Sequence, residues 1–527
     1  MDDVNTSRNT PDLYPPAWLH VLSVLVYAWL AVRLFLWGGW GLGFTLLILL
    51  TEAMIYGWLL LPRGAAKPDR FRLTRGRIGL LAVLTACIVC LAACYAIWSS
   101  LPLRVINFLV LAVLLLVQFM LLFRLSGKDW DHPLFWLESA LAPLVRPLLC
   151  LGELKHVKQL VRPTGSETQG QRHPALRQAI AIAAGVLIAL PLLLLLGSLL
   201  ASADAVFADK IAGLTAWLQR FSFTRLARQL LTALVLAPFI FSVLESGRRQ
   251  RRILSLTDGQ QSGLKANPGR TAFARTILIT ILVFVTGLYA FFAVIQYQYL
   301  SGALRSILPE HLTYAEYARS GFFELLAVSL VNLVLIYLAA RAARTQTTTA
   351  WTLRVLEWLL ILGSLIQWVS AISRMRLYVD TYGLTRLRFL STAFMGLILV
   401  WHILFVLQIF MRRLPLFKSM AIAAVFALLV LNAVNPDWQI ARYNVQHEAQ
   451  SDLDQAYLLE LSDDAVICYL PLLQAADPKL AKEMRLHLEG RLERLNAMRW
   501  QELSWQQWRL RSELTAALAG NQGLSAG

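Results

Sequence analysis

The stretch SRMRLYVDTYGLTRLRF, Ser373 to Phe389, lies between two long apolar runs at about 351–372 and 390–410. It contains four arginines, one aspartate and two tyrosines. Each flanking run is long enough to cross, as a helix, a hydrocarbon layer roughly 30 Å thick. Because charged side chains are costly inside that layer, the sequence predicts two membrane helices joined by a polar segment at one membrane surface.

Similar apolar runs recur through most of the 527 residues, of which 57% are hydrophobic and 15% charged. This composition excludes an ordinary soluble protein. The runs lack the alternation of barrel strands, and backbone groups in lipid must pair within their own segment. We therefore expect an all-α, polytopic helical membrane protein with about 11 transmembrane helices. The expected spans lie at about 18–37, one ending near 61, and then 78–98, 103–123, 176–200, 230–244, 274–294, 322–340, 351–372, 390–410 and 419–434.

The basic residues predict the orientation of these helices. The net charge of +17 arises largely in short loops beside apolar runs, above all at 63–77 and 247–270, which is typical of cytoplasmic loops. The same placement argues against nucleic acid as a partner. The orientation divides the chain into a cytoplasmic N-terminal segment (1–17), a transmembrane helical bundle (18–434) and an extracytoplasmic, extramembrane helical tail domain (435–527).

The predicted tail begins with a helix-start signal. Asn435 is a suitable N-cap residue, and Pro436 fits the first helical position. Downstream, apolar residues recur at helical spacing, and opposite charges lie three or four residues apart in 481–500. Three tryptophans are expected to pack inside this domain, with contact to the membrane surface as the alternative. They are Trp500, Trp505 and Trp508.

With this orientation, short polar segments gather on the outer side, each at the end of an expected span. They mix carboxylates with arginines and tyrosines, and such groups at a membrane surface pair with each other or line a wet cavity. In one interpretation, ion pairs and tyrosine anchors fix loops to helix ends. In another, a shared pocket binds an anionic head group, phosphate or carboxylate through its arginines. The candidate outer-face binding residues are Asp204, Glu316, Arg319, Arg374, Arg376, Asp380, Tyr382, Arg386, Arg388, Asp437 and Arg442.

Three ionisable residues fall inside expected spans: Glu52, Glu357 and His402. Ionisable residues inside a membrane are functional candidates by default. A relay of protons or cations through Glu52 and His402 would suit a secondary transporter. A protonated carboxyl, or a hydrogen bond to a neighbouring helix, is the structural alternative.

Four segments carry a resemblance to a known family. They are SADAVFA (202–208), TYAEYARSGFFEL (313–325), RMRLYVDTYGLTRLR (374–388) and NPDWQIARYN (435–444), in this order and each at a span end. With them the chain resembles a family of bacterial polytopic inner-membrane proteins catalogued as a domain of unknown function (four-one-seven-three). The resemblance implies a multi-pass protein of the bacterial cytoplasmic (inner) membrane with a similar helical layout, and it implies no activity.

Three function classes remain open. A transporter or flippase-like protein predicts a polar path through the bundle. A sensor, scaffold or envelope assembly factor predicts that outer loops and tail bind a protein partner. An enzyme acting on a lipid-linked anionic substrate is the least expected, because no nucleophile beside a histidine base is visible.

The expected partners are the bilayer, an anionic lipid or envelope precursor, and a protein at the outer face. Cys87, Cys90 and Cys94 share one helix face without a carboxylate or imidazole beside them, and we interpret them as small apolar residues. We therefore expect no metal, no cofactor and no catalytic residue.

Overall fold

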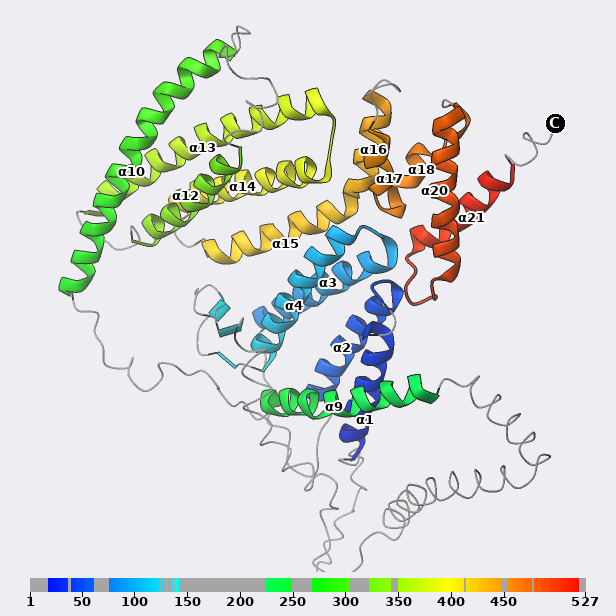
Figure 1. Cartoon of the computed structure of the whole chain (residues 1–527). Coiled ribbons are helices and arrows are strands. Elements are labelled where there is room, and N and C mark those ends of the chain that lie inside the picture. Colours follow the sequence, from blue (N-terminus) through cyan, green and yellow to red (C-terminus); the bar gives the residue numbers. More distant parts are fainter. Residues whose placement is uncertain are drawn as a thin grey trace, which may run out of the picture. The chain divides into compact units, whose positions relative to one another are not determined.

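The computed structural model describes residues 18–36, 39–60, 75–123, 223–248, 268–303, 322–342, 349–411, 414–447, 454–475 and 478–520, with single positions between 125 and 141. Within these residues every regular element is a helix, which confirms the all-α prediction (Figure 1). The chain forms two compact units. One comprises 1–37, 53–72 and 144–249, and the other comprises 38–52, 73–143 and 250–527.

Every expected span that falls on described residues is a helix. The expected span at 176–200 lies outside the described residues. Eight of the described helices are long and apolar enough to cross a membrane, and shorter apolar stretches lie at Leu42–Trp58 and Ala327–Ala342. The bounds are α1 Trp18–Ala31 with the π-helical η1 Val32–Leu36, α2 Leu42–Leu60, α3 Arg75–Ile97, α4 Leu101–Leu122, α9 Phe223–Arg248, α10 Pro268–Ala303, α12 Phe322–Ala342, α13 Thr349–Tyr382, α14 Arg386–Phe410 and α15 Leu416–Val434.

These helices expose many large apolar side chains, among them Phe284, Trp351, Phe410 and Phe426. A soluble surface rarely carries contiguous apolar patches of this extent, whereas a surface in contact with lipid requires them. The protein is therefore a membrane protein.

In the first unit, α1, η1 and α9 pack together with the last part of α2. Trp58 is fully buried there, and it meets His20 and Phe241 edge to face, with ring centroids 5.4 Å and 5.8 Å away. Edge-to-face contacts of this kind fit the charge distribution of aromatic rings. This aromatic contact holds three segments that are far apart in the sequence.

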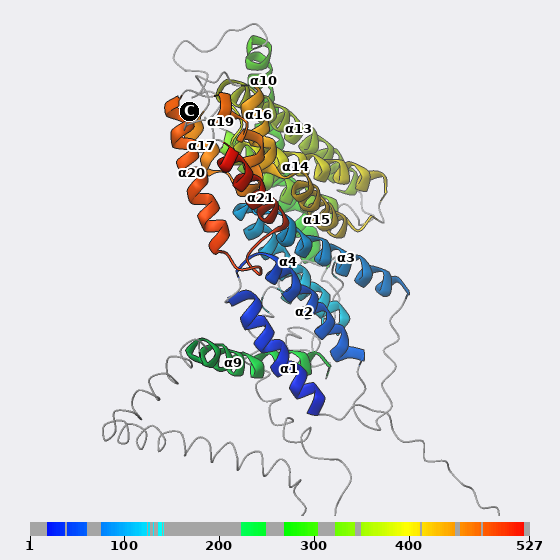
Figure 2. The ribbon, with the colours of Figure 1, turned by 90° about the vertical axis from the view of Figure 1, so that its right-hand side faces the viewer.

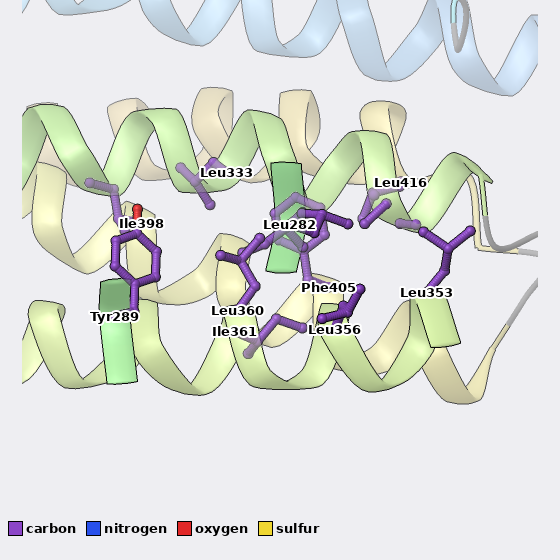
Figure 3. Packing of buried hydrophobic residues seen from close by; sticks show 13 residues of the cluster. Leu282, Tyr289, Leu333, Leu353, Leu356, Leu360, Ile361, Ile398, Phe405 and Leu416 are labelled. Carbon is purple, nitrogen blue, oxygen red and sulfur yellow. The ribbon is translucent and has the colours of Figure 1, made fainter. Parts of the chain in front are cut away.

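In the second unit, α10, α12, α13 and α14 enclose one apolar core. Leu282 of α10, Leu360 of α13 and Phe405 of α14 are fully buried in it and point toward one another (Figure 3). Tyr289 of α10 lies so close to α13 that a Cβ on Gly363 would meet its Cβ at 3.1 Å. A glycine at this position therefore allows the close approach of the two helices.

The segment 373–389, expected as a polar connection, is mostly helical. Helix α13 has 34 residues and is roughly 51 Å long at 1.5 Å per residue, so it outlasts a hydrocarbon layer of roughly 30 Å. It stops at Gly383, whose φ of 70° favours glycine. Helix α14 starts at Arg386, and the hydroxyl of the N-cap residue Thr385 accepts a hydrogen bond from the Arg388 amide. The connection itself is three residues long.

The tail follows α15 after a single residue. Asn435 has φ 51° and ψ 85°, and Pro436 is the first residue of the next helix, as predicted. We call the helices from Pro436 to Gly520 the tail bundle (Figure 2). It comprises α16 Pro436–His447, α17 Gln455–Glu460, the 3-10 helix η3 Asp463–Ala465, α18 Val466–Tyr469, α19 Leu472–Ala475, α20 Pro478–Ala497 and α21 Trp505–Gly520.

The core of the tail bundle is built from aliphatic residues and one tyrosine. Tyr469, Leu488 and Leu514 are fully buried in it. The expectation that the three tail tryptophans fill this core is wrong. Trp500, Trp505 and Trp508 are 57%, 60% and 53% exposed, and the last two stack on each other with ring centroids 5.3 Å apart. Leucines at every third or fourth position of α21 occupy the buried face instead.

Candidate functional site

The tail bundle is bound to the membrane helices by a set of buried polar contacts, which we call the clamp. The clamp comprises the contacts of Ser99, Leu384, Arg386, Asp437, Asn444, Ser462 and Asp464. It lies where α3 and α15 end and where α4 and α14 begin, and we call this end of the helices the tail side.

The strongest contact of the clamp joins Arg386, the first residue of α14, to Asp437 in the first turn of α16. The guanidinium donates to both carboxylate oxygens, at 2.8 Å and 2.9 Å. The Asp437 side chain is 1% exposed and that of Arg386 28%. Burial alone would raise the pKa of the Asp437 carboxyl, but donors from Arg386 and Ser462 outweigh it and hold the pKa below its usual range. Asp437 is therefore a carboxylate at neutral pH.

A second contact fixes the turn between α13 and α14. The Asn444 side chain of α16 accepts from the Leu384 amide and donates to the Leu384 carbonyl, each at 2.9 Å. The Tyr457 hydroxyl accepts from the Arg386 amide at 2.6 Å. The Leu384 amide and carbonyl and the Arg386 amide are thus paired with tail side chains.

Two neighbouring aspartates in η3 have different partners: Asp464 contacts the turn between α3 and α4, and Asp463 contacts the tail bundle. Asp464 accepts from the amide and the hydroxyl of Ser99, in the turn between α3 and α4, at 2.8–3.0 Å. Burial raises the pKa of the Asp464 carboxyl to about 6 despite these donors. Asp463 turns into the tail bundle, where it accepts from Arg491, Arg494 and Gln507.

The loop between α20 and α21 covers the start of α2. The Leu42 amide donates to the Leu503 carbonyl at 3.3 Å, and the Gly43 amide donates to the Gln501 carbonyl at 2.9 Å. These are amides of the first helical turn, which lack partners within their own helix. The approach is so close that a Cβ on Gly41 would lie 2.2 Å from the Glu502 carbonyl oxygen.

The remaining outer-face candidates divide into two groups. Arg388 donates to the Tyr382 and Gly383 carbonyls and lies 3.9 Å from the Tyr378 ring centroid, so it completes the end of α13. Arg442 stacks over its neighbour Trp438. With the Arg386–Asp437 pair, these contacts are of the kind expected when ion pairs fix loops to helix ends. Three further candidates lie outside the described residues, namely Asp204, Glu316 and Arg319.

Arg376 and Asp380 form the second group. They lie one turn apart on α13, both are exposed, and neither forms a hydrogen bond or ion pair with any residue that the structure describes. They line a cavity of about 420 Å³ whose other walls include Leu384, Phe389 and Tyr443. The floor at Met375 belongs to an apolar cluster with Ala371 and Met395. Arg374, one turn before Tyr378, is half-buried.

Below this apolar cluster, α13 carries a row of buried polar side chains. Glu357, Ser364 and Gln367 are spaced by seven and three residues and therefore share one helix face. The Ser364 hydroxyl lies 2.8 Å from Nε2 of His402 on α14. The side-chain amide of Asn332 on α12 donates to Oε1 of Gln367 at 3.0 Å, and Oδ1 of Asn332 in turn accepts from the Tyr289 hydroxyl.

The pairing of Ser364 with His402 sets the antiparallel register of α13 and α14. Glu357 lies seven residues before Ser364, and Gln408 lies six residues after His402, so both are roughly 10 Å further along at 1.5 Å per residue. Both are buried. Oε1 of Gln408 has no hydrogen-bond partner among the described residues. We call the six side chains Asn332, Glu357, Ser364, Gln367, His402 and Gln408 the polar row.

Glu52 lies apart from the polar row, between α2, α3 and α4. Its carboxyl accepts from the Gln118 amide at 2.8 Å, and the same amide nitrogen lies 2.8 Å from the Thr85 hydroxyl. The relay expected from the sequence runs through Glu52 and His402. In the structure Glu52 is hydrogen-bonded to α4 and His402 to α13, so the two residues belong to different polar groups. Nearer the tail side, Asn107 of α4 and Asn432 of α15 exchange two hydrogen bonds at 2.7 Å and 2.9 Å.

Cys87, Cys90, Cys94 and Cys468 are free thiols. Within the described part of the chain, no group of histidines, cysteines and carboxylates is placed to hold a metal ion.

Sequence reasoning singled out Arg386 and Asp437 but missed Ser99, Asn444, Asp463 and Asp464. The local signal was present: adjacent aspartates after Ser462 fit the first turn of a helix. It does not reveal which distant segment each aspartate meets.

Comparison with known proteins gives one match. A family model described as a domain of unknown function (DUF4153) matches residues 85–470. No curated protein and no solved structure matches the chain. The matched range runs from within α3 to the end of α18, so it holds the clamp and the polar row and stops before α20. The motifs thus led correctly to a domain of unknown function, and the model that matches is numbered 4153 rather than four-one-seven-three.

Proposed function

Because the chain belongs to the DUF4153 family, for which no activity is stated, we propose a function from the site alone: a secondary transporter for a small acidic solute. The observation that carries this proposal is the order of groups along α13. An outer cavity with Arg376 and Asp380 comes first, an apolar plug at Met375 next, and the polar row last.

Each layer has a role in alternating access. The Arg376 guanidinium, whose donors have no partner among the described residues, suits an acidic group of the solute. Met375, Ala371 and Met395 lie between the cavity and the polar row, and in the proposed cycle this apolar cluster closes the tail side. His402 is the one residue of the polar row whose ordinary pKa lies near neutral, and it is the group that we assign to proton coupling.

We place the tail side outside the cytoplasmic membrane of a bacterium, following the distribution of basic loops. A coupled transporter of this kind takes its energy from a gradient, which agrees with the lack of a phosphate-binding glycine motif in the sequence.

Proteoliposomes loaded with a pH-sensitive dye test the proposal. The purified chain should acidify the lumen when phosphate is added outside, and His402→Asn, which keeps a similar shape without the titratable ring, should reduce the initial rate at least tenfold. Gly396→Ala is the matched control on α14, because a Cβ at this position meets no atom within 4 Å. Rates equal to those of empty liposomes, or an unchanged rate for His402→Asn, would refute it.

A second candidate function is an envelope scaffold that binds a protein through its tail. The clamp and the loop between α20 and α21 favour it, because their contacts with α2, the α3–α4 turn and α14 hold the tail bundle in one pose and so present a rigid surface. Cross-linking in intact cells from Trp505, on the exposed face of α21, tests this candidate. A single specific adduct would support the scaffold, and adducts with lipid alone would oppose it.

A further inference from the structure

A second cavity lies between the tail bundle and the start of α4, within one compact unit. Its volume is about 830 Å³. Ser99, Leu101 and Pro102 form its membrane-side wall, and residues of α17, η3 and α20 form the wall opposite. The size falls within the range of sites for small organic ligands, which is roughly 300–1,000 Å³.

One wall of this cavity is basic. Arg386, Arg491 and Arg494 line it together with His487, whereas its carboxylates are Asp463 and Glu460. Arg491 is buried, and its guanidinium donates hydrogen bonds to Asp463, His487 and the Leu459 and Leu461 carbonyls.

Arg494 differs from Arg491. It donates one bond, to Asp463 at 2.9 Å, and its side chain is 59% exposed. An arginine has five N–H donors, so this guanidinium can still bind an anion in two-pronged fashion.

The cavity also has exposed apolar side chains, one on each of its two walls. Leu101, in the first turn of α4, is 64% exposed, and Leu486 of α20 is 72% exposed. Both line the cavity. Leu101 opens a helix long and apolar enough to cross a membrane, and the ends of such helices meet the lipid head groups.

We propose that this cavity binds an acidic amphiphile, with its phosphate or carboxylate on Arg494 and its chain along Leu101 and Leu486. The remaining donors of the exposed Arg494 guanidinium select an anion, and the two exposed leucines select a ligand with a hydrocarbon chain. This inference concerns a different cavity from the one in the proposed function and does not depend on transport.

Binding to the full-length protein in detergent tests the inference. Three probes are compared by titration calorimetry: dihexanoyl-phosphatidylglycerol, dihexanoyl-phosphatidylcholine and inorganic phosphate. Phosphatidylglycerol should bind at least tenfold more tightly than phosphatidylcholine, since only the first carries a net negative charge. Weaker binding of inorganic phosphate would identify a lipid, and equal binding would identify a free phosphate as the ligand of the same arginine site.

Variants locate the binding. Arg494→Gln should weaken phosphatidylglycerol binding at least tenfold, and Arg485→Gln is the control, because Arg485 lies on the same helix, pairs with Glu489 and does not line the cavity. Leu486→Ser should weaken phosphatidylglycerol binding and leave phosphate binding unchanged. Because Leu486 is largely exposed, this variant keeps the fold. Equal affinity for both lipids, or equal losses for Arg485→Gln and Arg494→Gln, would overturn the inference.

Discussion

Removing the two members of the clamp's ion pair one at a time should have unequal effects. Arg386→Met leaves the Asp437 carboxylate, 1% exposed, with the Ser462 amide at 3.2 Å and the Ser100 side chain as hydrogen-bond donors. A buried charge deprived of its partner costs about 3 kcal/mol or more. Asp437→Asn leaves a guanidinium that is 28% exposed and still donates to the Glu460 carbonyl, so we expect a loss of about 1 kcal/mol.

The difference is large enough to measure. In a unit of 60–100 residues, 1 kcal/mol changes the Tm by about 4–8 °C, so the two variants should differ by about 10 °C. Arg386→Met should have the lower Tm, because Asp437→Asn removes the buried charge and keeps one side-chain oxygen that can accept from Arg386.

Cys468 offers a reporter inside the tail bundle. Burial raises the pKa of its thiol to about 11, so it reacts slowly until the tail unfolds. A thiol-reactive dye added to protein whose other four cysteines are serine therefore follows the unfolding of the tail during heating.

Arg509→Met is the matched control, because Arg509 pairs with Glu513 at 2.8 Å on the surface of α21, where its side chain is 55% exposed. Pairs of this kind contribute about 0–1 kcal/mol. The reasoning fails if Asp437→Asn lowers the Tm as much as Arg386→Met, or if the control lowers it equally.

Three further changes address other contacts of the tail side. Gly41→Ala brings a Cβ to 2.2 Å from a backbone carbonyl, so limited proteolysis should cut the tail at least tenfold faster, whereas Gly396→Ala should leave the rate unchanged. The pKa of Asp464 is raised from 3.8 to about 6, so the folded state binds this proton more tightly than the unfolded state. The free energy of unfolding in urea should therefore fall by about 2–3 kcal/mol as the pH rises through this window. Asp464→Asn should abolish this pH dependence. Asn107→Leu removes the hydrogen-bond partner of the Asn432 side chain and should lower the free energy of unfolding by about 1–3 kcal/mol. Adding Asn432→Leu should restore most of this loss in the urea titration. A double variant less stable than the single one would contradict this.

The helices could be predicted from the sequence because their signal is local. A run of apolar residues reports its own burial in lipid, and Pro436 and Gly383 mark their own helix boundaries. The pairing of Arg386 with Asp437 could not be predicted, although both were candidates, since neither residue's neighbours in sequence carry information about the partner. Trp500 and Trp505 were misjudged because aromatic character alone does not state which face of a helix is buried.

Asp464 and Ser99 show the limit most clearly, since 365 residues separate them. A polar tail has no hydropathy signal that says where it docks. The candidate cavity on α13 could be predicted only in part. Arg376 and Asp380 lie one helical turn apart in the sequence, but Tyr443, on the far wall, comes from another helix.

The order of synthesis gives the clamp one more consequence. The ribosome makes α2, α3 and α4 hundreds of residues before the tail, and segments synthesised early fold early. The backbone amides at the start of α2 and in the turn at Ser99 therefore lack their tail partners until the last helices have been synthesised. Docking of the tail can succeed only when α2, α3, α4 and α14 have all been inserted with the right ends together. Docking of the tail bundle would in this way report, at the end of biogenesis, whether these helices are correctly inserted. A chain with one misinserted helix would present an undocked tail to cellular proteases.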